Sequence, residues 1–206
     1  MTQKSKTREY IESLVIAALI AFLVRGFVIQ AFRIPSGSME PTLQVGDHLL
    51  VNRLSYVVKI PFTDIVVLRL GKPDRGDVIV FRYPEDRSKD FIKRVIGKEG
   101  DVIEIKDKVI YLNGKKMNDP HAHFAEDRII PGAYAPRDNM PAITVPKDAY
   151  FCMGDNRDRS LDSRFWGFVK TNDLVGRALI IYFSWNGMPD SFFDYVRWER
   201  IGRLIR

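Results

Sequence analysis

Residues 101–117 read DVIEIKDKVIYLNGKKM, and this stretch decides the fold class. Apolar and polar side chains alternate along it, as they do in strands that bury one face. The dipeptide Asn113-Gly114 favours left-handed backbone and is typical of a two-residue hairpin turn. The stretch therefore predicts a β-hairpin with one face packed in a core.

The sequence on both sides of this hairpin predicts more strands. Runs rich in β-branched and aromatic residues lie at 48–58 (HLLVNRLSYVV), 77–83 (DVIVFRY), 142–145, 149–153 and 174–185. Between them, residues 118–141 hold several prolines and glycines and predict an irregular surface excursion. Helical periodicity is poor throughout, so we expect one mainly β domain over residues 33–206.

The N-terminal part has a different character. Residues 14–24 (LVIAALIAFLV) carry no polar side chain, and apolar residues resume after Arg25 and continue to Phe32. The strict run has the length of a signal-peptide core or a buried helix, whereas 11–32 is long enough to cross a bilayer if Arg25 extends toward the headgroups. Because no Ala-x-Ala-like cleavage site follows, we expect an uncleaved transmembrane signal-anchor over 11–32.

The charges before this segment predict its orientation. Lys4, Lys6 and Arg8 precede it, and basic flanks stay on the cytoplasmic side. We therefore expect residues 1–10 in the cytoplasm and the β domain outside it, attached to the cell (inner) membrane by a single pass.

Composition restricts the partners. The 206 residues contain 32 Lys and Arg and 26 Asp and Glu, a net charge of +6, with no basic block. This balance favours a lipid surface and argues against nucleic acid. The single cysteine, Cys152, excludes an intrachain disulfide and a cysteine-based zinc site.

Three motifs could carry chemistry, and the first is PSGSMEPT at 35–42. Prolines and a glycine around two hydroxyls predict a rigid turn that exposes a serine oxygen and points backbone N–H groups at a developing oxyanion. The alternative is an ordinary turn that joins the anchor to the body.

The second motif is DFIKRVIG at 90–97, in which Lys93 lies among apolar residues of a strand-like run. A lysine can serve as the base for a serine only when it is neutral, and burial lowers its pKa toward that state. The alternative is a solvated lysine beside Arg94.

The third motif is GDNRDRSLDSRFWG at 154–167, where Asp and Arg alternate. Such a pattern predicts a self-paired network that fixes a loop. Four residues could instead ligate Ca²⁺, namely Asp155, Asn156, Asp158 and Asp162, but neighbouring arginines would neutralise the site and the spacing is not that of an EF-hand. We expect no metal.

A triad with histidine is a further alternative. His48 follows Asp47 at the start of a predicted strand, but adjacent strand residues point to opposite faces. His121 and His123 lie in the irregular excursion. We expect none of the three histidines to be catalytic.

Together, in this order after an apolar segment, SGSMEPTL, RGDVIVF (75–81), KRVIG and GDNRDRSLDSRFWG resemble bacterial type I signal peptidases, a family of Ser/Lys peptidases. The resemblance spans about Phe32 to Ser184. It implies the mainly β signal-peptidase fold and a membrane-bound serine endopeptidase that removes signal peptides from exported preproteins. It also implies Ser38 as the nucleophile, Lys93 as the general base, and no cofactor.

The resemblance implies roles for further residues. The Ser36 side chain and the Ser38 N–H would form the oxyanion hole, and Ser160 would orient Lys93. Arg94 with Asp155, and Arg164 with Asp162, would support the site. Substrate would contact Phe32, Ile34, Pro35, Met39, Leu43, Asp90, Phe91 and Ile92.

The expected partners are signal peptides with small residues one and three positions before the cut, membrane lipids and, indirectly, the secretion machinery. Two other functions stay open from the sequence. One is a membrane-tethered β module without enzymatic activity, and the other is a self-cleaving Ser/Lys protease of the repressor type.

Overall fold

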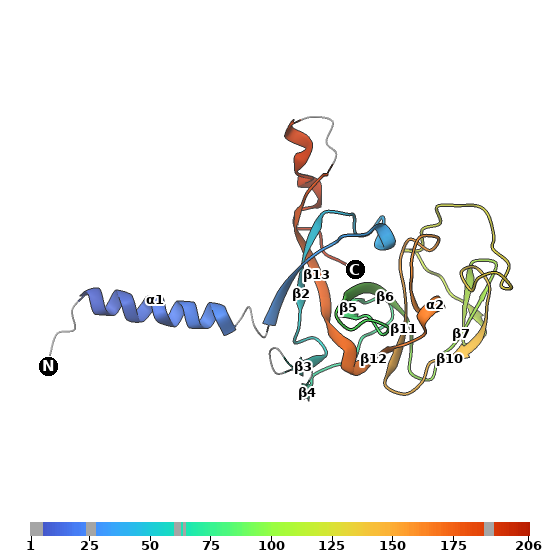
Figure 1. Cartoon of the computed structure of the whole chain (residues 1–206), viewed down its shortest axis with the longest axis horizontal. Helices are drawn as coiled ribbons and strands as arrows, with labels where there is room; N and C mark the ends of the chain where they lie inside the picture. Colours follow the sequence, from blue (N-terminus) through green and yellow to red (C-terminus); the bar gives the residue numbers. More distant parts are fainter. Residues whose placement is uncertain (1–5, 24–27, 60–62, 64, 188–191) are drawn as a thin grey trace.

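The structure is a computed structural model, and it describes residues 6–23, 28–59, 63, 65–187 and 192–206. Helix α1 (Lys6–Leu23) projects from one side of a β body (Figure 1). The apolar side chains along it are exposed, with 71% for Leu14 and 56% for Leu19. The helix therefore contributes little to the core of the body.

The body is built on a seven-stranded sheet in which every neighbouring pair is antiparallel. In spatial order its strands are β1 (Ile29–Arg33), β2 (Asp47–Asn52), β13 (Leu174–Ser184), β5 (Val78–Arg82), β6 (Asp90–Lys98), β11 (Ala149–Met153) and β12 (Val169–Lys170). The mainly β prediction is confirmed, and the runs predicted at 77–83, 149–153 and 174–185 correspond to β5, β11 and β13.

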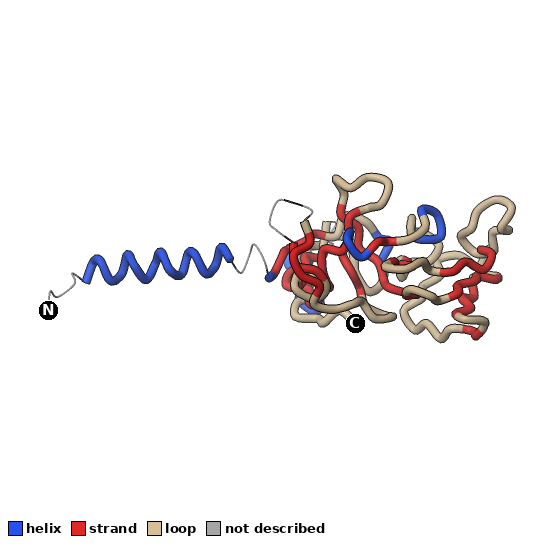
Figure 2. The backbone as a smooth tube through the Cα atoms, turned by 90° about the horizontal axis from the view of Figure 1, so that it is seen from below, coloured by secondary structure: helices blue, strands red, loops and turns tan. Residues whose placement is uncertain are grey.

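The stretch that predicted the fold lies in a second sheet, at the end of the body far from α1 (Figures 1 and 2). Its order is β10 (Met140–Thr144), β7 (Val102–Lys106), β8 (Val109–Leu112) and β9 (Lys115–Lys116). Asn113 and Gly114 have φ angles of 53° and 76° and form the predicted turn between β8 and β9. A second such turn, at Asp107 and Lys108 with φ of 47° and 69°, has no Asn-Gly signal and was not predicted.

The predicted strand at 48–58 is two strands. β2 ends at Asn52, whose side chain accepts a hydrogen bond from the Leu54 N–H and opens a turn. β3 (Val57–Lys59) then pairs with β4 (Val66–Arg69) in a separate two-stranded sheet. The single-strand interpretation was wrong because the apolar pattern alone does not show where a side chain such as Asn52 hydrogen-bonds to the backbone and ends a strand.

The C-terminal boundary of the predicted membrane span is also wrong. Residues 29–33 are strand β1, which pairs with β2 from Ile29↔Asn52 to Arg33↔His48. Residues 24–27, the centre of the predicted span's second half, lie outside the described residues. Among the helices that the structure describes, none combines the length and apolar character that a bilayer crossing requires.

Short helical turns complete the body: η2 (Gly37–Met39), α2 (Ser163–Trp166), η3 (Thr171–Asp173), η4 (Phe192–Tyr195) and η5 (Trp198–Arg200). Apolar side chains form three core clusters. One lies under the η2 turn and includes Met39 and Leu43. Another contains Ile79, Phe81 and Cys152, beside the strand that carries Lys93. The site lies where these two clusters meet.

Candidate active site

Ser38 lies on the η2 turn, between the edge strand β1 and the start of β2. A Cβ at Gly37 would meet the Glu40 carboxylate at 2.9 Å, so a larger residue there would require the Glu40 side chain to move. The next side chain, Met39, is fully buried, which anchors the turn in the core. Ser38 itself is half-buried. The turn therefore holds its hydroxyl at the surface of the body on a fixed backbone.

Lys93 comes from the middle of β6, and its side chain is buried, with 4% of the residue exposed. The Lys93 Nζ lies 2.7 Å from the Ser38 Oγ and donates to the Ile92 carbonyl at 3.0 Å. The ring of Phe91 covers it, with 5.4 Å between Nζ and the ring centroid. The structure thus brings the two expected dyad residues together, although 55 positions separate them in the chain.

Burial lowers the pKa of Lys93 from 10.5 to about 8, against the opposing attraction of Asp162 and Asp155 and a contribution from Cys152. A free lysine is neutral about once in a few thousand molecules at pH 7, whereas a pKa near 8 leaves roughly one in ten neutral. The surroundings of Lys93 therefore supply an appreciable population of amine that can accept a proton.

Arg94, the next residue of β6, forms a two-pronged ion pair with Asp155. Its Nε and Nη2 donate to the two carboxylate oxygens at 2.8 and 2.7 Å, and both side chains are almost fully buried. Arg94 also donates to the Gly76 carbonyl at 2.7 Å. Asp155 in turn accepts from the Thr42 hydroxyl at 2.6 Å, which joins the loop to the turn that carries Ser38.

The second expected pair, Arg164 with Asp162, closes the same loop. The Arg164 Nη2 and Nε donate to the Asp162 carboxylate at 2.8 and 2.9 Å. Burial opposes the charge on Asp162, but the Arg164 guanidinium keeps the pKa of this carboxyl below its usual range. Arg164 also donates to the carbonyls of Arg157 and Arg137, so it ties the loop to the excursion.

Calcium ligation was the alternative for this loop, and its acids are already engaged by cations. Asp155 and Asp162 hold Arg94 and Arg164, and Asp158 accepts from the Lys108 ammonium at 2.9 Å. Each carboxylate therefore has its charge balanced within the protein.

Ser160 departs from its expected role as the residue that orients Lys93. Its Oγ is buried and makes no hydrogen bond to the Lys93 Nζ, which contacts the Ser38 Oγ and the Ile92 carbonyl. Ser160 lies instead near the Asp162 carboxylate and contributes to the lowered pKa of that group. Ser160 also packs on Gly154, where an added Cβ would lie 2.3 Å from the Ser160 Oγ and 2.4 Å from the Ser38 carbonyl oxygen. Ser160 is thus close to the η2 turn that carries Ser38, but it makes no direct bond to the Lys93 amine.

The residues expected to contact substrate divide into two groups. Ile34, Met39 and Leu43 are at most 2% exposed and belong to the core under the turn. Phe32, Phe91 and Ile92 are half-buried, and Pro35 and Asp90 are exposed. Strand β11 pairs with β6 only from Arg94 onward, so the segment at 90–92 and the edge strand β1 both present backbone beside Ser38.

The histidines are placed elsewhere. Asp47 accepts from Arg200 and from the Ser184 hydroxyl, and is fully buried. His48 points to the other face and packs its ring on Tyr182 and Phe183. No Asp-His pair forms at this position.

His123 binds the 154–167 loop through its backbone and not through its imidazole ring. The His123 N–H donates to the Asp155 carbonyl at 2.8 Å, and its carbonyl accepts from the Arg157 N–H at 2.8 Å. His121 lies in the same excursion, where its N–H donates to the Asp119 carboxylate at 3.1 Å. The excursion is irregular, as predicted, but it packs on the loop of the site, and a buried pair of Asp119 with Arg157 joins them.

Two supports were not identified in the sequence. Asn156 donates from its N–H to the Ser38 carbonyl at 3.1 Å and from its Nδ2 to the Gly37 carbonyl at 3.2 Å. Arg200 donates to the Thr42 carbonyl at 3.0 Å and to Asp47, 153 positions away. From the sequence, Asn156 was considered only as a possible calcium ligand, whereas no sequence signal points to Arg200.

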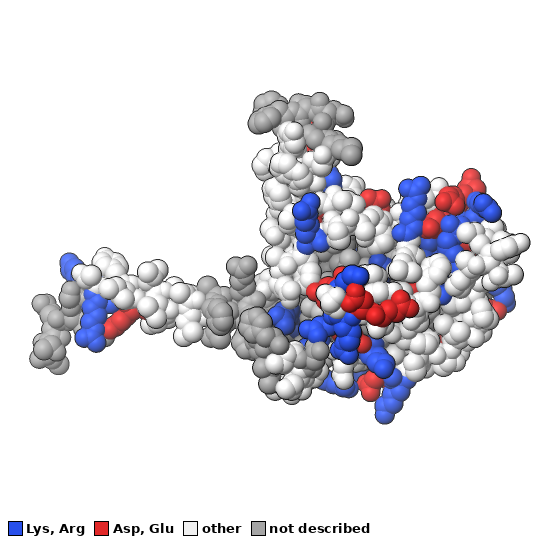
Figure 3. Space-filling view, in the orientation of Figure 1, with Lys and Arg blue, Asp and Glu red and all other residues white. Residues whose placement is uncertain are grey.

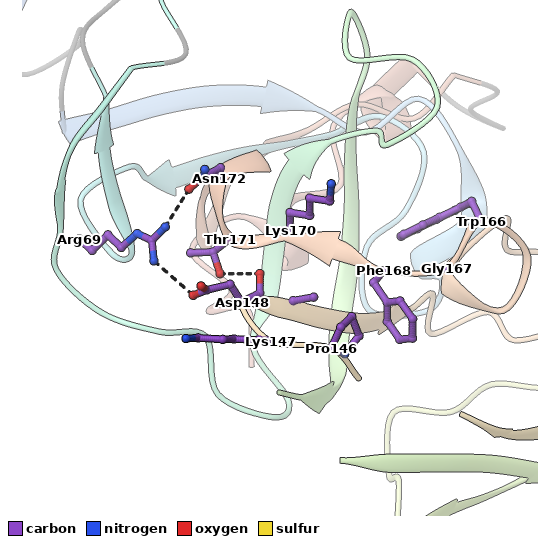
Figure 4. A pocket seen from close by; sticks show the side chains of 11 residues that line it. Arg69, Pro146, Lys147, Asp148, Trp166, Gly167, Phe168, Lys170, Thr171 and Asn172 are labelled. Atoms are coloured by element: carbon purple, nitrogen blue, oxygen red, sulfur yellow. Dashed lines mark hydrogen bonds and ion pairs between the residues drawn. The ribbon is translucent and has the colours of Figure 1, made fainter. Parts of the chain in front are cut away.

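A pocket of about 500 Å³ lies apart from the dyad, between β4 and the edge formed by β11 and β12 (Figure 4). Arg69 lines it and bridges Asp148 and Asn172 at 3.2 and 3.1 Å. Trp166 also lines it and lies edge-on to Tyr83, whose ring stacks on Phe91 at 4.3 Å. The pocket contains neither Ser38 nor Lys93.

Comparison with known proteins identifies the family. Residues 7–185 match the family described as signal peptidase, peptidase S26. A signal peptidase I from Pseudomonas fluorescens is 37% identical over 86% of this chain and 72% of its own length. One from Buchnera aphidicola subsp. Acyrthosiphon pisum is 34% identical over 98% of this chain and 84% of its own length. A probable signal peptidase I-2 from Synechocystis is 37% identical over 82% and 70%. The chain therefore belongs to the signal peptidase family, peptidase S26.

Proposed function

We propose that this chain is a serine endopeptidase that removes signal peptides from exported preproteins, with Ser38 as nucleophile and Lys93 as general base. The observation that carries the proposal is the 2.7 Å approach of a buried amine to a serine hydroxyl. A nucleophilic serine needs an adjacent base, and an amine whose pKa is lowered by burial can be that base near neutral pH.

The proposed reaction begins with neutral Lys93. Its Nζ takes the Ser38 proton while the Ser38 Oγ bonds to the scissile carbonyl carbon, and the carbonyl oxygen becomes an oxyanion. The Lys93 ammonium then gives its proton to the leaving amine as the C–N bond breaks, which leaves an acyl-enzyme on Ser38. Water, deprotonated by the again neutral Lys93, hydrolyses the ester and frees the signal peptide.

Backbone presented by both flanking segments supports a role in substrate binding. Residues 32–35 and 90–92 would pair with an extended substrate by strand addition. Phe32 and Ile92 are half-buried and would offer apolar contact to small residues before the cut. Three core residues would contribute indirectly, by packing beneath the substrate-contacting residues and holding them in place: Ile34, Met39 and Leu43.

The apolar N-terminal segment is proposed as the membrane attachment. Ile11, Leu14, Val15 and Ile16 on α1 are 57–71% exposed. In Figure 3, charged atoms gather at the N-terminal end of this helix, and the rest of its described surface is uncharged. Apolar surface of this extent favours a lipid environment, and the basic flank favours the cytoplasmic side for the N-terminus. Protease treatment of intact spheroplasts should then degrade the β body and spare the N-terminal tail.

Cleavage of a model preprotein tests the function. Wild type should release a mature protein whose new N-terminus follows a small residue, and Ser38→Ala and Lys93→Ala should be inactive. Lys93→Arg should also be inactive, because a guanidinium does not lose its proton near neutral pH. The matched control is Lys98→Arg on the same strand, where Lys98 pairs with the exposed Asp74 and should tolerate the change. Turnover by the Ser38 or Lys93 variants would leave a non-enzymatic β module or another site as the explanation.

A further inference from the structure

Asn156 is almost fully buried, with 3% exposed, and both of its donors reach the nucleophile turn. The Nδ2 donates to the Gly37 carbonyl at 3.2 Å and the N–H donates to the Ser38 carbonyl at 3.1 Å. Two consecutive carbonyls of the turn are therefore held from the inside by one residue. The sequence motif that contains Asn156 gave it no role in the chemistry.

Because the peptide group is planar, the hydrogen bond to the Gly37 carbonyl also fixes the direction of the Ser38 N–H. In a trans peptide the C=O of one residue and the N–H of the next point in opposite directions. The Gly37 carbonyl accepts from the Asn156 Nδ2 and from the Glu40 N–H of the same turn, both at 3.2 Å. The N–H of Ser38, on the opposite side of that peptide, is therefore aimed away from Asn156. The proposed function needs that N–H as a donor to the oxyanion.

A second property of Asn156 argues against a purely stabilising role. Its Oδ1 is buried and has no hydrogen-bond partner among the described residues. A buried acceptor without a donor lowers stability, so an amide is a costly side chain to place in this space. The amide is positioned for what its Nδ2 does.

Asn156 is itself held in place by its neighbours. A parallel bridge joins it to His123 of the excursion, and its carbonyl accepts from the Arg159 N–H at 3.2 Å. Asp155, the preceding residue, is fixed by Arg94. The donor therefore stands on a rigid support, as a group that orients a catalytic peptide must.

We propose that Asn156 is a positioning residue that fixes the peptide between Gly37 and Ser38, so that the Ser38 N–H points at the oxyanion formed during cleavage. The proposal rests on the proposed function and deepens it. It predicts that Asn156 acts in the transition state and leaves the binding of intact substrate unchanged.

The test replaces the amide by groups that cannot donate. Asn156→Asp keeps the shape and loses the Nδ2 donor, and Asn156→Ala removes the side chain without adding charge. Both should lower kcat by about 10- to 100-fold, somewhat less than the loss of an oxyanion donor itself, with KM changed less than about threefold. The matched control is Asn172→Asp, an exposed asparagine on the rim of the separate pocket, which should keep the wild-type kcat.

A binding measurement separates positioning from damage to the fold. A peptide aldehyde with the cleavage-site sequence forms an oxyanion on Ser38, whereas an uncleavable peptide of the same sequence does not. In the Asn156 variants the aldehyde should bind at least about tenfold more weakly and the uncleavable peptide as in wild type. Direct titration reports the Kd of the folded molecules, so partial unfolding changes the number of sites and leaves the Kd unchanged.

The outcomes distinguish this inference from the function beneath it. If wild type cleaves the preprotein and Ser38→Ala does not, yet both Asn156 variants keep kcat and aldehyde binding within about twofold, the positioning role is overturned while the function stands. Equal weakening of both peptides would also overturn it, because Asn156 would then serve binding. If wild type does not cleave, the proposed function fails and the inference falls with it.

Discussion

Lys93 and Arg94 are neighbours on β6, both cationic in solution and both at most 4% exposed, yet they have opposite surroundings. Adjacent strand residues point to opposite faces. On one face Arg94 meets the carboxylate of Asp155 with two hydrogen bonds. On the other, Lys93 meets a hydroxyl and a carbonyl, and no carboxylate pairs with its Nζ among the described residues. A buried cation with a counterion stays charged and can support the fold, whereas one without a counterion can lose its proton, as the proposed base must.

The difference also depends on the choice of residue type. A guanidinium stays charged at any pH that a protein meets and fits a carboxylate with two bonds, while an ammonium loses its proton when desolvated. Exchange of the two side chains would therefore destroy both functions.

Removal of the proposed base should have the largest effect. Lys93→Met keeps the length and apolar stem of the side chain but has no amine, so kcat should fall by at least about 10⁴-fold. Single-turnover cleavage of a preprotein measures the loss. A fall of less than tenfold would mean that Ser38 is activated by another group or is not the nucleophile.

Removal of the support should act on stability first. Arg94→Met leaves the Asp155 carboxylate buried without its counterion, which should lower the free energy of unfolding by about 3–5 kcal/mol. Urea denaturation measures it, and the double variant Arg94→Met/Asp155→Leu should recover most of the loss. The control, Lys98→Met, breaks an exposed pair and should cost less than about 1 kcal/mol. Equal costs for both would show that the buried pair carries no special weight.

The opposite sign is expected for the lysine. Its pKa falls from 10.5 to about 8 on folding, so the unfolded chain binds more protons between these values and stability rises with pH there. Below pH 8 the penalty is fully present, at about 3 kcal/mol from the conversion of roughly 1.4 kcal/mol per pKa unit. Lys93→Met should therefore be more stable than wild type at pH 7, by up to this amount.

The pH dependence provides the control for that prediction. The stability advantage of Lys93→Met should shrink as the pH rises from 8 to 10.5, because folded wild type then carries no charge at position 93 and the unfolded chain loses its own. Urea unfolding at pH 7 and at pH 10 measures both values. A constant difference would assign the gain to packing instead of to the cost of a buried charge.

A smaller effect is expected at Gly154, where the 154–167 loop packs against the turn that carries Ser38. Gly154→Ala would place a Cβ 2.4 Å from the Ser38 carbonyl oxygen and 2.3 Å from the Ser160 Oγ, so the nucleophile turn must shift. Such overpacking costs about 1–3 kcal/mol, and kcat should fall as well. Gly187→Ala is the matched control, because its Cβ would meet none of the described residues within 4 Å. If both variants have the wild-type Tm and kcat, the close approach at Gly154 has no role.

Much of this comparison could be predicted from sequence, because local patterns carry it. Alternation at 101–117 and the Asn113-Gly114 turn indicated the β fold. The alternating Asp and Arg of 154–164 predicted a self-paired network, which holds for Asp162 with Arg164. The prediction was wrong for Asp155, Asp158 and Arg157, which pair with Arg94, Lys108 and Asp119 outside the loop. The motifs around Ser38 and Lys93 stand out by their residue types. The local patterns could not show that Ser38 and Lys93 meet, because the two residues are 55 positions apart and come together only through the folding of the sheet.

Other features depend on tertiary context. Residues 29–32 of β1 were assigned to the membrane span because most of them are apolar, and pairing with β2 makes them part of a strand. Asp47 was weighed as a partner of His48, but it is bound to Arg200, which lies 153 positions away. Ser160 was given a bond to Lys93 that the geometry does not contain. In each case the outcome depends on a segment that is distant in the chain, and the local sequence does not identify that segment.

The titration of Lys93 tests the central claim most directly. Lysine labelled with ¹³C at Cε reports its own protonation by NMR, and the signal of Lys93 is assigned by its loss in Lys93→Met. We predict a midpoint near pH 8 for this one lysine, well below the ordinary lysine value of 10.5. A midpoint for Lys93 at or above 10.5 would contradict it, because the amine would then be charged when the serine must be activated.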